Sequence, residues 1–450
     1  MPTPNKKIFC NVPWNEIHIY WDGGLGICHY ETHRLHKQYE ENFFILKKRY
    51  NITDMSMLDW FNSEPVKKFR HNMWGNDLQS ACGRCYDEEH KGSTSRRHRN
   101  NFKSEIHTRS AFNETFSNSK DYRNFLYSKE NKGETITKPI KLHIDLGNYC
   151  NLACKMCSPV ASSKIASQHV KWGRKEDSKY LGVDWTKNEI IWNKFLNDVI
   201  ELKISSIHFM GGETTLTKRF HDFLDFMIEK NNLNINLTFV TNGVIFDKTL
   251  MEKLKLFRYV DIEISIETIT KHNDYIRRGT NTIQVLENIK KYLEWCNNDK
   301  ISITLRSAVS ILSIGNYDTL IEYCLKEKLK IRPLIVNWPR FMQVNNLPEE
   351  LKKQYEKKYY SLLDHYDLKE LDIEKDFLES DSKEYKKIAK QAIIQALGLL
   401  KTKNPEDHEI QLENMVDHCK RWDSVYGFNA VELYPELKNI FKKYNYNNVS

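Results

Sequence analysis

Three cysteines stand close together in residues 147–159, which read GNYCNLACKMCSP. Cys150, Cys154 and Cys157 give the spacing C-x3-C-x2-C, and a thiolate is a strong ligand for a soft metal. A tetrahedral zinc site needs a fourth ligand, which would have to come from elsewhere in the chain. A [4Fe–4S] cluster can be held by three thiolates, with its fourth iron left open to another ligand. The loop therefore indicates a metal centre, and the iron–sulfur cluster explains three thiolates without a missing partner.

The composition is that of a folded protein with reduced thiols. The chain has 450 residues, enough for two or three domains, and 40% of them are hydrophobic. The first residues lack the apolar stretch of a secretory signal, and no run approaches the roughly 18 apolar residues of a membrane span. We therefore expect a soluble cytoplasmic protein with no membrane partner, in which clustered cysteines hold metal. The net charge of +8 permits a nucleic-acid or acidic-peptide partner without requiring one.

The middle of the chain alternates strand-like and helix-like segments. The helix-like segments carry apolar residues at i, i+3, i+4 and i+7, and two more helices are expected at 160–173 and 188–202. Six β-then-α units in series predict an α/β fold with a parallel sheet, either open or closed into a barrel. The strands are expected at 140–147, 205–213, 235–243, 259–268, 301–310 and 330–338.

These strands also alternate between apolar and polar residues. In the first, Leu142 and Ile144 share one face while His143 and Asp145 share the other. Strands covered on both faces would instead be continuously hydrophobic. The pattern predicts a partial barrel with a wet polar lumen, unlike the packed interior of a closed eight-stranded barrel. The residues expected to line this substrate cavity are His143, Asp145, Glu263 and Thr304.

The remaining motifs fall at the carboxyl ends of the strands, where chemistry gathers in parallel α/β barrels. The cysteine loop follows the first strand, and GGE (211–213) ends the second. TNG (241–243) ends the third strand, and SIET (265–268) ends the fourth. Paired glycines beside Glu213 allow the backbone to approach a small ligand closely.

This combination resembles the radical S-adenosylmethionine (SAM) superfamily, whose partial (β/α)6 barrel opens with CxxxCxxC after the first strand. The resemblance implies that Cys150, Cys154 and Cys157 bind a [4Fe–4S] cluster whose open iron chelates SAM. It also implies one-electron reductive cleavage of SAM to a 5′-deoxyadenosyl radical, with flavodoxin or ferredoxin as reductant. Thr214 stands where the family usually has proline. The cofactor contacts expected from the resemblance are Gly211, Gly212, Glu213, Asn242, Ser265, Glu267 and Arg306.

Two N-terminal segments, 9–31 and 78–97, resemble the SPASM and twitch auxiliary-cluster modules. The likeness rests on a Cys-x-x-Pro-Trp start, a glycine before a cysteine in a hairpin, and a later C-x2-C. In the family this module usually follows the barrel, whereas here it precedes it. A second iron–sulfur cluster is expected, with a structural zinc ribbon or a metal-free site as alternatives. Its four candidate ligands are Cys10, Cys28, Cys82 and Cys85.

The expected organisation is therefore an auxiliary-cluster module at 1–137, a radical SAM partial barrel at 138–345 and a C-terminal helical extension at 346–450. Cys296 and Cys324 fall on apolar helix faces and are expected in the core. Cys419 is also expected to be a core or surface thiol, although its segment resembles the end of twitch-type enzymes, where it could reach a cluster or donate a hydrogen atom. The basic run 91–109 predicts a solvated helix face, with docking of RNA or an acidic peptide as the alternative.

Auxiliary modules of this type most often accompany members that modify peptides or proteins, so the resemblance implies hydrogen abstraction from a peptide or protein substrate. Modification of a small polar metabolite or of RNA is the alternative within the enzyme class. A zinc-ribbon protein that binds nucleic acid is the alternative from another class. The sequence does not distinguish epimerisation, crosslinking and oxidation.

Overall fold

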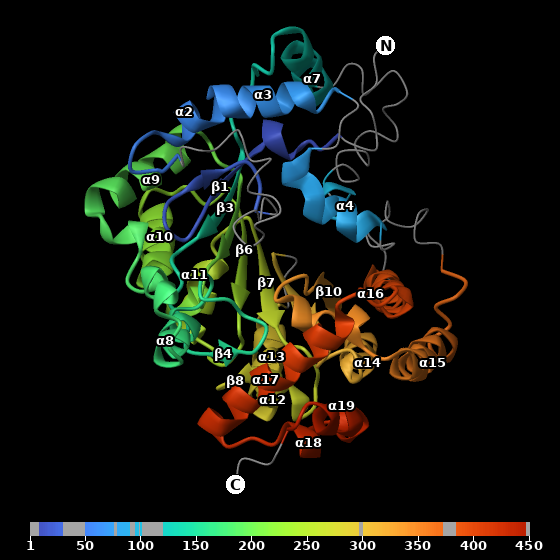
Figure 1. Ribbon diagram of the computed structural model, residues 1–450. Helices are drawn as coiled ribbons and strands as arrows, with labels where there is room; N and C mark the ends of the chain where they lie inside the picture. Colours follow the sequence, from blue (N-terminus) through green and yellow to red (C-terminus); the bar gives the residue numbers. More distant parts are fainter. Residues whose placement is uncertain are drawn as a thin grey trace.

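One large sheet organises the molecule, and most of its strands are parallel (Figure 1). The computed structural model describes residues 9–29, 50–75, 79–90, 95–98, 100, 120–296, 300–371 and 384–446. From one edge to the other, the strands are β10 (Lys330–Ile335), β9 (Ile301–Val309), β7 (Tyr259–Ser265), β6 (Asn236–Thr241), β5 (Ser206–Met210), β3 (Lys141–Asp145), β1 (Glu16–Ile19) and β2 (Leu25–Gly26).

Six of these strands, from β3 to β10, are the six expected from the sequence. Each pairs in parallel with its neighbour, in the order in which the chain makes them. The expected α/β fold with a partial barrel is therefore confirmed. A short second sheet joins β4 (Ala153–Cys154) to β8 (Arg277–Arg278) in antiparallel fashion.

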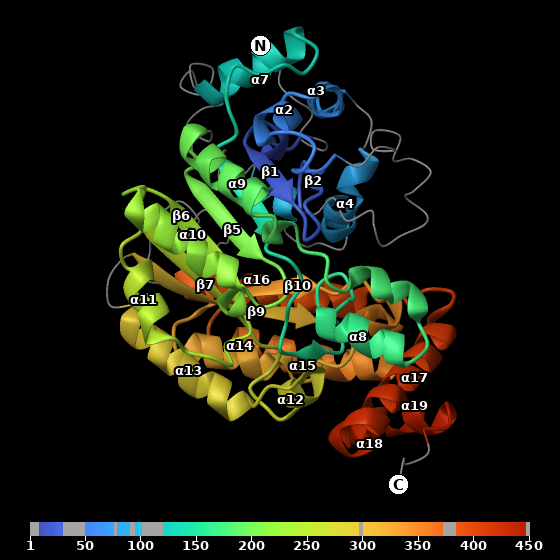
Figure 2. The same cartoon turned by 90° about the vertical axis from the view of Figure 1, so that its left-hand side faces the viewer.

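Helices cover the outer face of the sheet, as the apolar spacing predicts (Figure 2). Phe209 on β5 contacts two rings of α10, Phe220 at 5.2 Å and Phe223 at 5.0 Å between centroids. The helices expected at 160–173 and 188–202 are present as α8 and α9. The barrel helices are α8 (Ser163–Lys171), α9 (Glu189–Glu201), α10 (Lys218–Glu229), α11 (Lys248–Leu254), α12 (His272–Ile276), α13 (Thr282–Trp295) and α14 (Tyr317–Lys326).

The N-terminal module continues the sheet of the barrel. Strand β1 pairs in parallel with β3, and β2 returns antiparallel to β1 as a hairpin. Ile17 and Ile19 of β1 are fully buried in the same hydrophobic core as Ile144 of β3. This shared sheet was not predicted from the sequence. The helices of the module are α2 (Met57–Phe61), α3 (Glu64–Asn72), α4 (Gly83–His90) and α7 (Lys120–Glu130).

The C-terminal residues form helices that pack on the barrel, as expected. Helix α16 packs against β10, while α17 covers the side that carries the cysteine loop (Figure 1). Trp422 of α17 is buried with Ala153 and Ile165, and Cys157 packs against them. These helices are α15 (Glu349–His365), α16 (Glu384–Lys401), α17 (His408–Tyr426), α18 (Ala430–Leu433) and α19 (Lys438–Lys443).

Among the described helices, none has both the length and the apolar composition needed to cross a lipid bilayer.

Candidate functional site

The three cysteines of the loop after β3 lie together. Burial, and after it the neighbouring Cys154, raises the pKa of Cys150 to about 12. The pKa of Cys157 is also raised, first by burial and then by Cys154 and Cys150. In this group of thiols Cys154 is buried and the other two are half-buried, and a cation stabilises such crowded thiols as thiolates. The donor set and its crowding therefore fit the expected [4Fe–4S] cluster.

Arg277 supplies a fixed positive charge beside these thiols. It lies opposite Cys154 in the pairing of β8 with β4, and its charge lowers the pKa of all three cysteines. The guanidinium is anchored because Nη1 donates to Oε1 of Glu267 at 2.9 Å. We did not predict Arg277 from the sequence, although the segment Arg277-Arg278-Gly279 follows closely after SIET.

Glu213 ties two of the strand-end motifs together. Its Oε1 accepts hydrogen bonds from the hydroxyls of Thr215 at 2.8 Å and Thr241 at 2.7 Å, and its Oε2 accepts from the backbone N–H of Asn242 at 2.7 Å. Asn242 in turn donates from Nδ2 to Oδ1 of Asn151, inside the cysteine loop, at 2.7 Å. GGE, TNG and the cysteine loop therefore form one hydrogen-bonded unit.

The paired glycines face the backbone of the cysteine loop. A Cβ on Gly211 would overlap the carbonyl oxygen of Gly147, and one on Gly212 would overlap that of Tyr149. The N–H of Glu213 donates to the same Tyr149 oxygen at 2.7 Å. The backbone that approaches these glycines closely is that of the cysteine loop. This contact fixes the cysteine loop against β5.

Glu267 and Ser265 differ in how far their side chains are engaged. Ser265 is half-buried at the end of β7, level with Arg306 of β9. Glu267 is fully buried, and besides Arg277 its carboxylate accepts from Ser307 at 3.1 Å and from the N–H of Ala308. The contacts of Glu267 are therefore made within the protein, where they hold Arg277 beside the cysteines.

The polar residues predicted on one face of the strands lie on neighbouring strands, and their charged groups pair with one another. Arg306 donates to Glu263 at 2.6 Å, and Arg332 of β10 also pairs with Glu263. Thr304 donates to Asp261 at 3.0 Å. A carboxylate removed from water needs such partners, and the buried Glu263 finds them in Arg306 and Arg332.

Histidines lie on the polar face of the neighbouring strands β1, β3 and β5. His143 and Asp145 project from β3, and His208 lies beside His143, with 4.5 Å between ring centroids. His18 of β1 completes the row, at 4.9 Å from His143. We did not predict His18 or His208 as site residues because the row appears only when the strand register is known.

The four cysteines of the N-terminal module line one small cavity. Cys10 precedes the β1–β2 hairpin and Cys28 follows it, while Cys82 and Cys85 come from the start of α4 and the turn before it. Burial, and after it the neighbouring Cys28, raises the pKa of Cys85 to about 12. As expected, a metal here would join the two halves of the module.

The basic run 91–109 includes two arginines that turn inward. Arg96 donates to Sγ of Cys28 at 2.8 Å and to both oxygens of Glu16, at 2.5 and 2.6 Å. Arg97 is buried and pairs with Glu89. These two residues are therefore not part of a solvated face or a docking surface, and the remainder of the run lies mostly outside the described residues.

Cys419 belongs to a buried layer beneath the cysteine loop. Burial raises its pKa to about 11, which keeps the thiol protonated, and it packs on Met415 with 3.8 Å between sulfurs. Lys155, within the cysteine loop, lies 4.0 Å from the ring centre of Tyr275 and 3.6 Å from Asp423. The core position expected for Cys419 agrees with this geometry, and Cys324 is likewise fully buried.

Comparison with known proteins finds two domains. The sequence pattern of the radical SAM superfamily matches residues 144–304, and that of the SPASM iron–sulfur cluster-binding domain matches residues 10–86. The first implies a [4Fe–4S] cluster with SAM, and the second a further iron–sulfur cluster. The second match favours iron over the zinc ribbon for Cys10, Cys28, Cys82 and Cys85.

Curated relatives share part of the chain. A PqqA peptide cyclase of Granulibacter bethesdensis is 24% identical over 139 residues, which cover 31% of this chain and 32% of the relative. The radical SAM cyclopropyl synthase TigE of Paramaledivibacter caminithermalis is 26% identical over 204 residues, 44% of this chain and 40% of the relative. The chain thus spans well under half the length of these relatives.

Solved structures show a distant likeness. Streptococcus suis SuiB bound to its precursor peptide SuiA aligns with a TM-score of 0.37 and 14% identity, over 71% of this chain and 67% of that one. SuiB bound to SAM aligns with a TM-score of 0.36 and 15% identity, over 67% and 62%. The two domain matches show that this chain carries a radical SAM domain and, ahead of it, a SPASM domain.

Proposed function

We propose that the protein is a radical SAM enzyme that abstracts hydrogen from a peptide or protein. The gathering of three thiols beside Arg277, at the carboxyl ends of the barrel strands, carries the proposal. When bound, the cluster and SAM supply one-electron reductive cleavage that yields a 5′-deoxyadenosyl radical. A flavodoxin or ferredoxin is the proposed reductant, and the cytoplasm the proposed location.

The chain's own residues would hold and orient these groups. Cys150, Cys154 and Cys157 would bind the cluster, with the charge of Arg277 balancing their thiolates. Glu213 and Asn242 would keep the loops in register, and Ser265 and Arg306 are proposed to contact SAM. The peptide part of the proposal is supported by the name of a curated relative, a PqqA peptide cyclase.

The first test is cleavage of SAM by the anaerobically reconstituted protein with dithionite. We expect 5′-deoxyadenosine from the wild type and none from the triple variant Cys150→Ala, Cys154→Ala, Cys157→Ala, because the cluster loses all three ligands. The matched control is Cys296→Ala, which removes a half-buried thiol at the end of α13 and should leave cleavage unchanged. Cleavage by the triple variant would disprove the assignment.

The second test identifies the substrate class. Peptide, small-metabolite and RNA fractions from cells grown in deuterated medium are each incubated with the enzyme and unlabelled SAM. Abstraction from a substrate transfers deuterium to 5′-deoxyadenosine, which mass spectrometry detects. We expect the label only with the peptide fraction, whereas label from the metabolite or RNA fraction alone would reject the peptide assignment.

A further inference from the structure

A row of histidines crosses three neighbouring strands at the same level of the sheet. His18 of β1 pairs in register with His143 of β3, which pairs with His208 of β5. The side chains of His18 and His143 are almost completely buried, with 2% and 1% exposed. In the part of the chain that the structure describes, neither ring nitrogen of His18 and not Nδ1 of His143 has a hydrogen-bond partner. Burying an imidazole nitrogen without a hydrogen-bond partner costs free energy. We therefore expect the row to bind a ligand.

A carboxylate completes a metal-binding set with these two rings. Asp145 follows His143 on the same face of β3, and its Oδ2 lies 3.6 Å from Nε2 of His18. Donor atoms of His18, His143 and Asp145 all lie within 4.8 Å of one another. Donors around a first-row ion, each at about 2.0–2.2 Å, are up to about 4.4 Å apart, so a small contraction would close the set.

The surroundings of His143 favour its neutral imidazole, which is the form that binds metal. Burial lowers the pKa of His143 well below its usual value, and His208, His18, Arg96 and Arg306 lower it further. The arginines near the row are themselves matched by acids, Arg96 by Glu16 and Arg306 by Glu263. Asp145 therefore remains as the carboxylate that can offset the charge of an ion.

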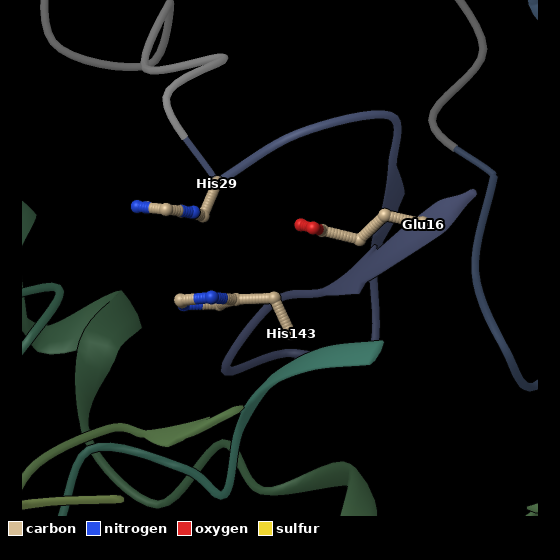
Figure 3. A group of neighbouring side chains, drawn as sticks. All are labelled: Glu16, His29 and His143. Carbon is tan, nitrogen blue, oxygen red and sulfur yellow. The ribbon is translucent and has the colours of Figure 1, made fainter. Parts of the chain in front are cut away.

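His143 also belongs to a second group, with Glu16 and His29. In Figure 3 the rings of His29 and His143 lie face to face, and the Glu16 carboxylate points toward them from β1. The two rings are stacked with 4.0 Å between their centroids. Both oxygens of Glu16 already accept hydrogen bonds from Arg96, however, so this carboxylate is the weaker candidate ligand.

We propose that His18, His143 and Asp145 bind one divalent first-row transition-metal ion on the lumen wall, separate from both iron–sulfur sites. Two imidazoles and a carboxylate suit Fe²⁺, Zn²⁺ and related ions. The ion joins β1 of the N-terminal module to β3 of the barrel. Three protein ligands leave at least one coordination position for a water or a substrate oxygen.

The test measures Zn²⁺ binding to the full-length protein after anaerobic reconstitution of its iron–sulfur clusters, so that the cluster thiolates are occupied. After removal of excess zinc, elemental analysis should find about one zinc per chain in addition to the iron. Zinc X-ray absorption should show only nitrogen and oxygen ligands at about 2.0–2.1 Å, and no sulfur at about 2.3 Å. Sulfur ligation, or no retained zinc, would overturn the proposal.

Variants assign the ligands. His18→Gln, His143→Gln and Asp145→Asn should each weaken zinc binding about 100-fold or more, since loss of outer-shell partners alone costs 10–100-fold. The control is His169→Gln, which alters a buried histidine paired with Asp177 at 2.8 Å on α8, away from the lumen. Unchanged binding in His18→Gln and Asp145→Asn, with loss in Glu16→Gln and His29→Gln, would overturn this ligand set.

Iron content and SAM cleavage are recorded for every variant. Because these readouts report the clusters alone, a failed zinc result with intact cleavage rejects the metal site and leaves the proposed function standing. Conversely, if the wild type binds zinc but does not cleave SAM, the proposed function is rejected and the metal site stands. If His143→Gln does not fold, His18→Gln and Asp145→Asn carry the test.

Discussion

At the level of single residues, Glu267 was predicted to contact the cofactor, and in the structure it contacts other residues of the protein. The resemblance to the superfamily implies a contact from this carboxylate to the cofactor. In the structure both of its oxygens are occupied, by Arg277 on one side and by Ser307 and Ala308 on the other. Its effect on the site is thus exerted through the position of Arg277, and a direct contact with SAM is not needed to explain its burial.

Removing this carboxylate should be severely destabilising. Glu267→Ala leaves Arg277 buried without its partner, and breaking a buried ion pair in this way costs about 3–5 kcal/mol. Urea unfolding measures the loss. The control is Glu322→Ala, which removes an exposed ion pair with Lys326 and a hydrogen bond from Tyr366, and should destabilise the protein much less. Equal losses in the two variants would show that Arg277 finds another partner.

At the level of elements, helix α17 docks on the cysteine loop through His418. Its Nε2 contacts the carbonyl oxygen of Lys155 at 3.1 Å, between two of the cluster cysteines. Burial, and after it the charge of Lys155, lowers the pKa of His418 to about 3. The docked ring is therefore neutral and donates to the carbonyl, which joins the C-terminal extension to the site.

This contact predicts a pH dependence. Between pH 6.5 and 3 the unfolded chain would bind a proton at His418 that the folded chain does not, so the free energy of unfolding falls as the pH falls through this window. The slope from one such group is at most about 1.4 kcal/mol per pH unit. His418→Gln keeps a donor to Lys155 and removes the titration, so thermal unfolding of the reconstituted variant should lose less stability on acidification than the wild type.

The control for this prediction is His71→Gln, at an exposed histidine of α3, which should follow the wild type. Parallel pH profiles for His418→Gln and the wild type would show that the proton is taken up elsewhere.

How far the sequence predicts this structure depends on the range of the interactions. The six barrel strands follow from local alternation, as in Leu142 and Ile144 against His143 and Asp145. The three cysteines and the strand-end motifs follow from short-range spacing. Strand β1 has four residues, and its place beside β3 depends on a register set across more than a hundred residues, which no local pattern contains. Arg277, Arg96 and the histidine row were missed for the same reason.

At the level of the whole molecule, the N-terminal module and the barrel share one sheet and one hydrophobic core. The domain boundary expected near residue 137 therefore separates segments of sequence that do not bury their surfaces independently. Strand β3 would present an unpaired edge without β1, and such an edge pairs readily with other chains.

A fragment of residues 138–450 tests this. We expect it to aggregate or to unfold at a clearly lower temperature than the full chain, because β3 loses its partner and the core loses Ile17 and Ile19. Size-exclusion chromatography and thermal unfolding make the comparison. Ile17→Ala in the full chain is the milder companion, with an expected cost of about 2–5 kcal/mol. A monomeric fragment with the full chain's unfolding temperature would show that the barrel folds alone.

The pairing of β1 with β3 also affects the order of folding events during synthesis of the chain. A ribosome makes about 5–20 residues per second, so β1 waits roughly 6–25 s before β3 has been synthesised. All four cysteines of the module, ending at Cys85, are complete before the first barrel cysteine, Cys150, exists. During synthesis the auxiliary site can thus gather its ligands first, while the hairpin that it holds still offers an open edge. The order of synthesis therefore completes the ligand set of the auxiliary site before β1 can pair with β3.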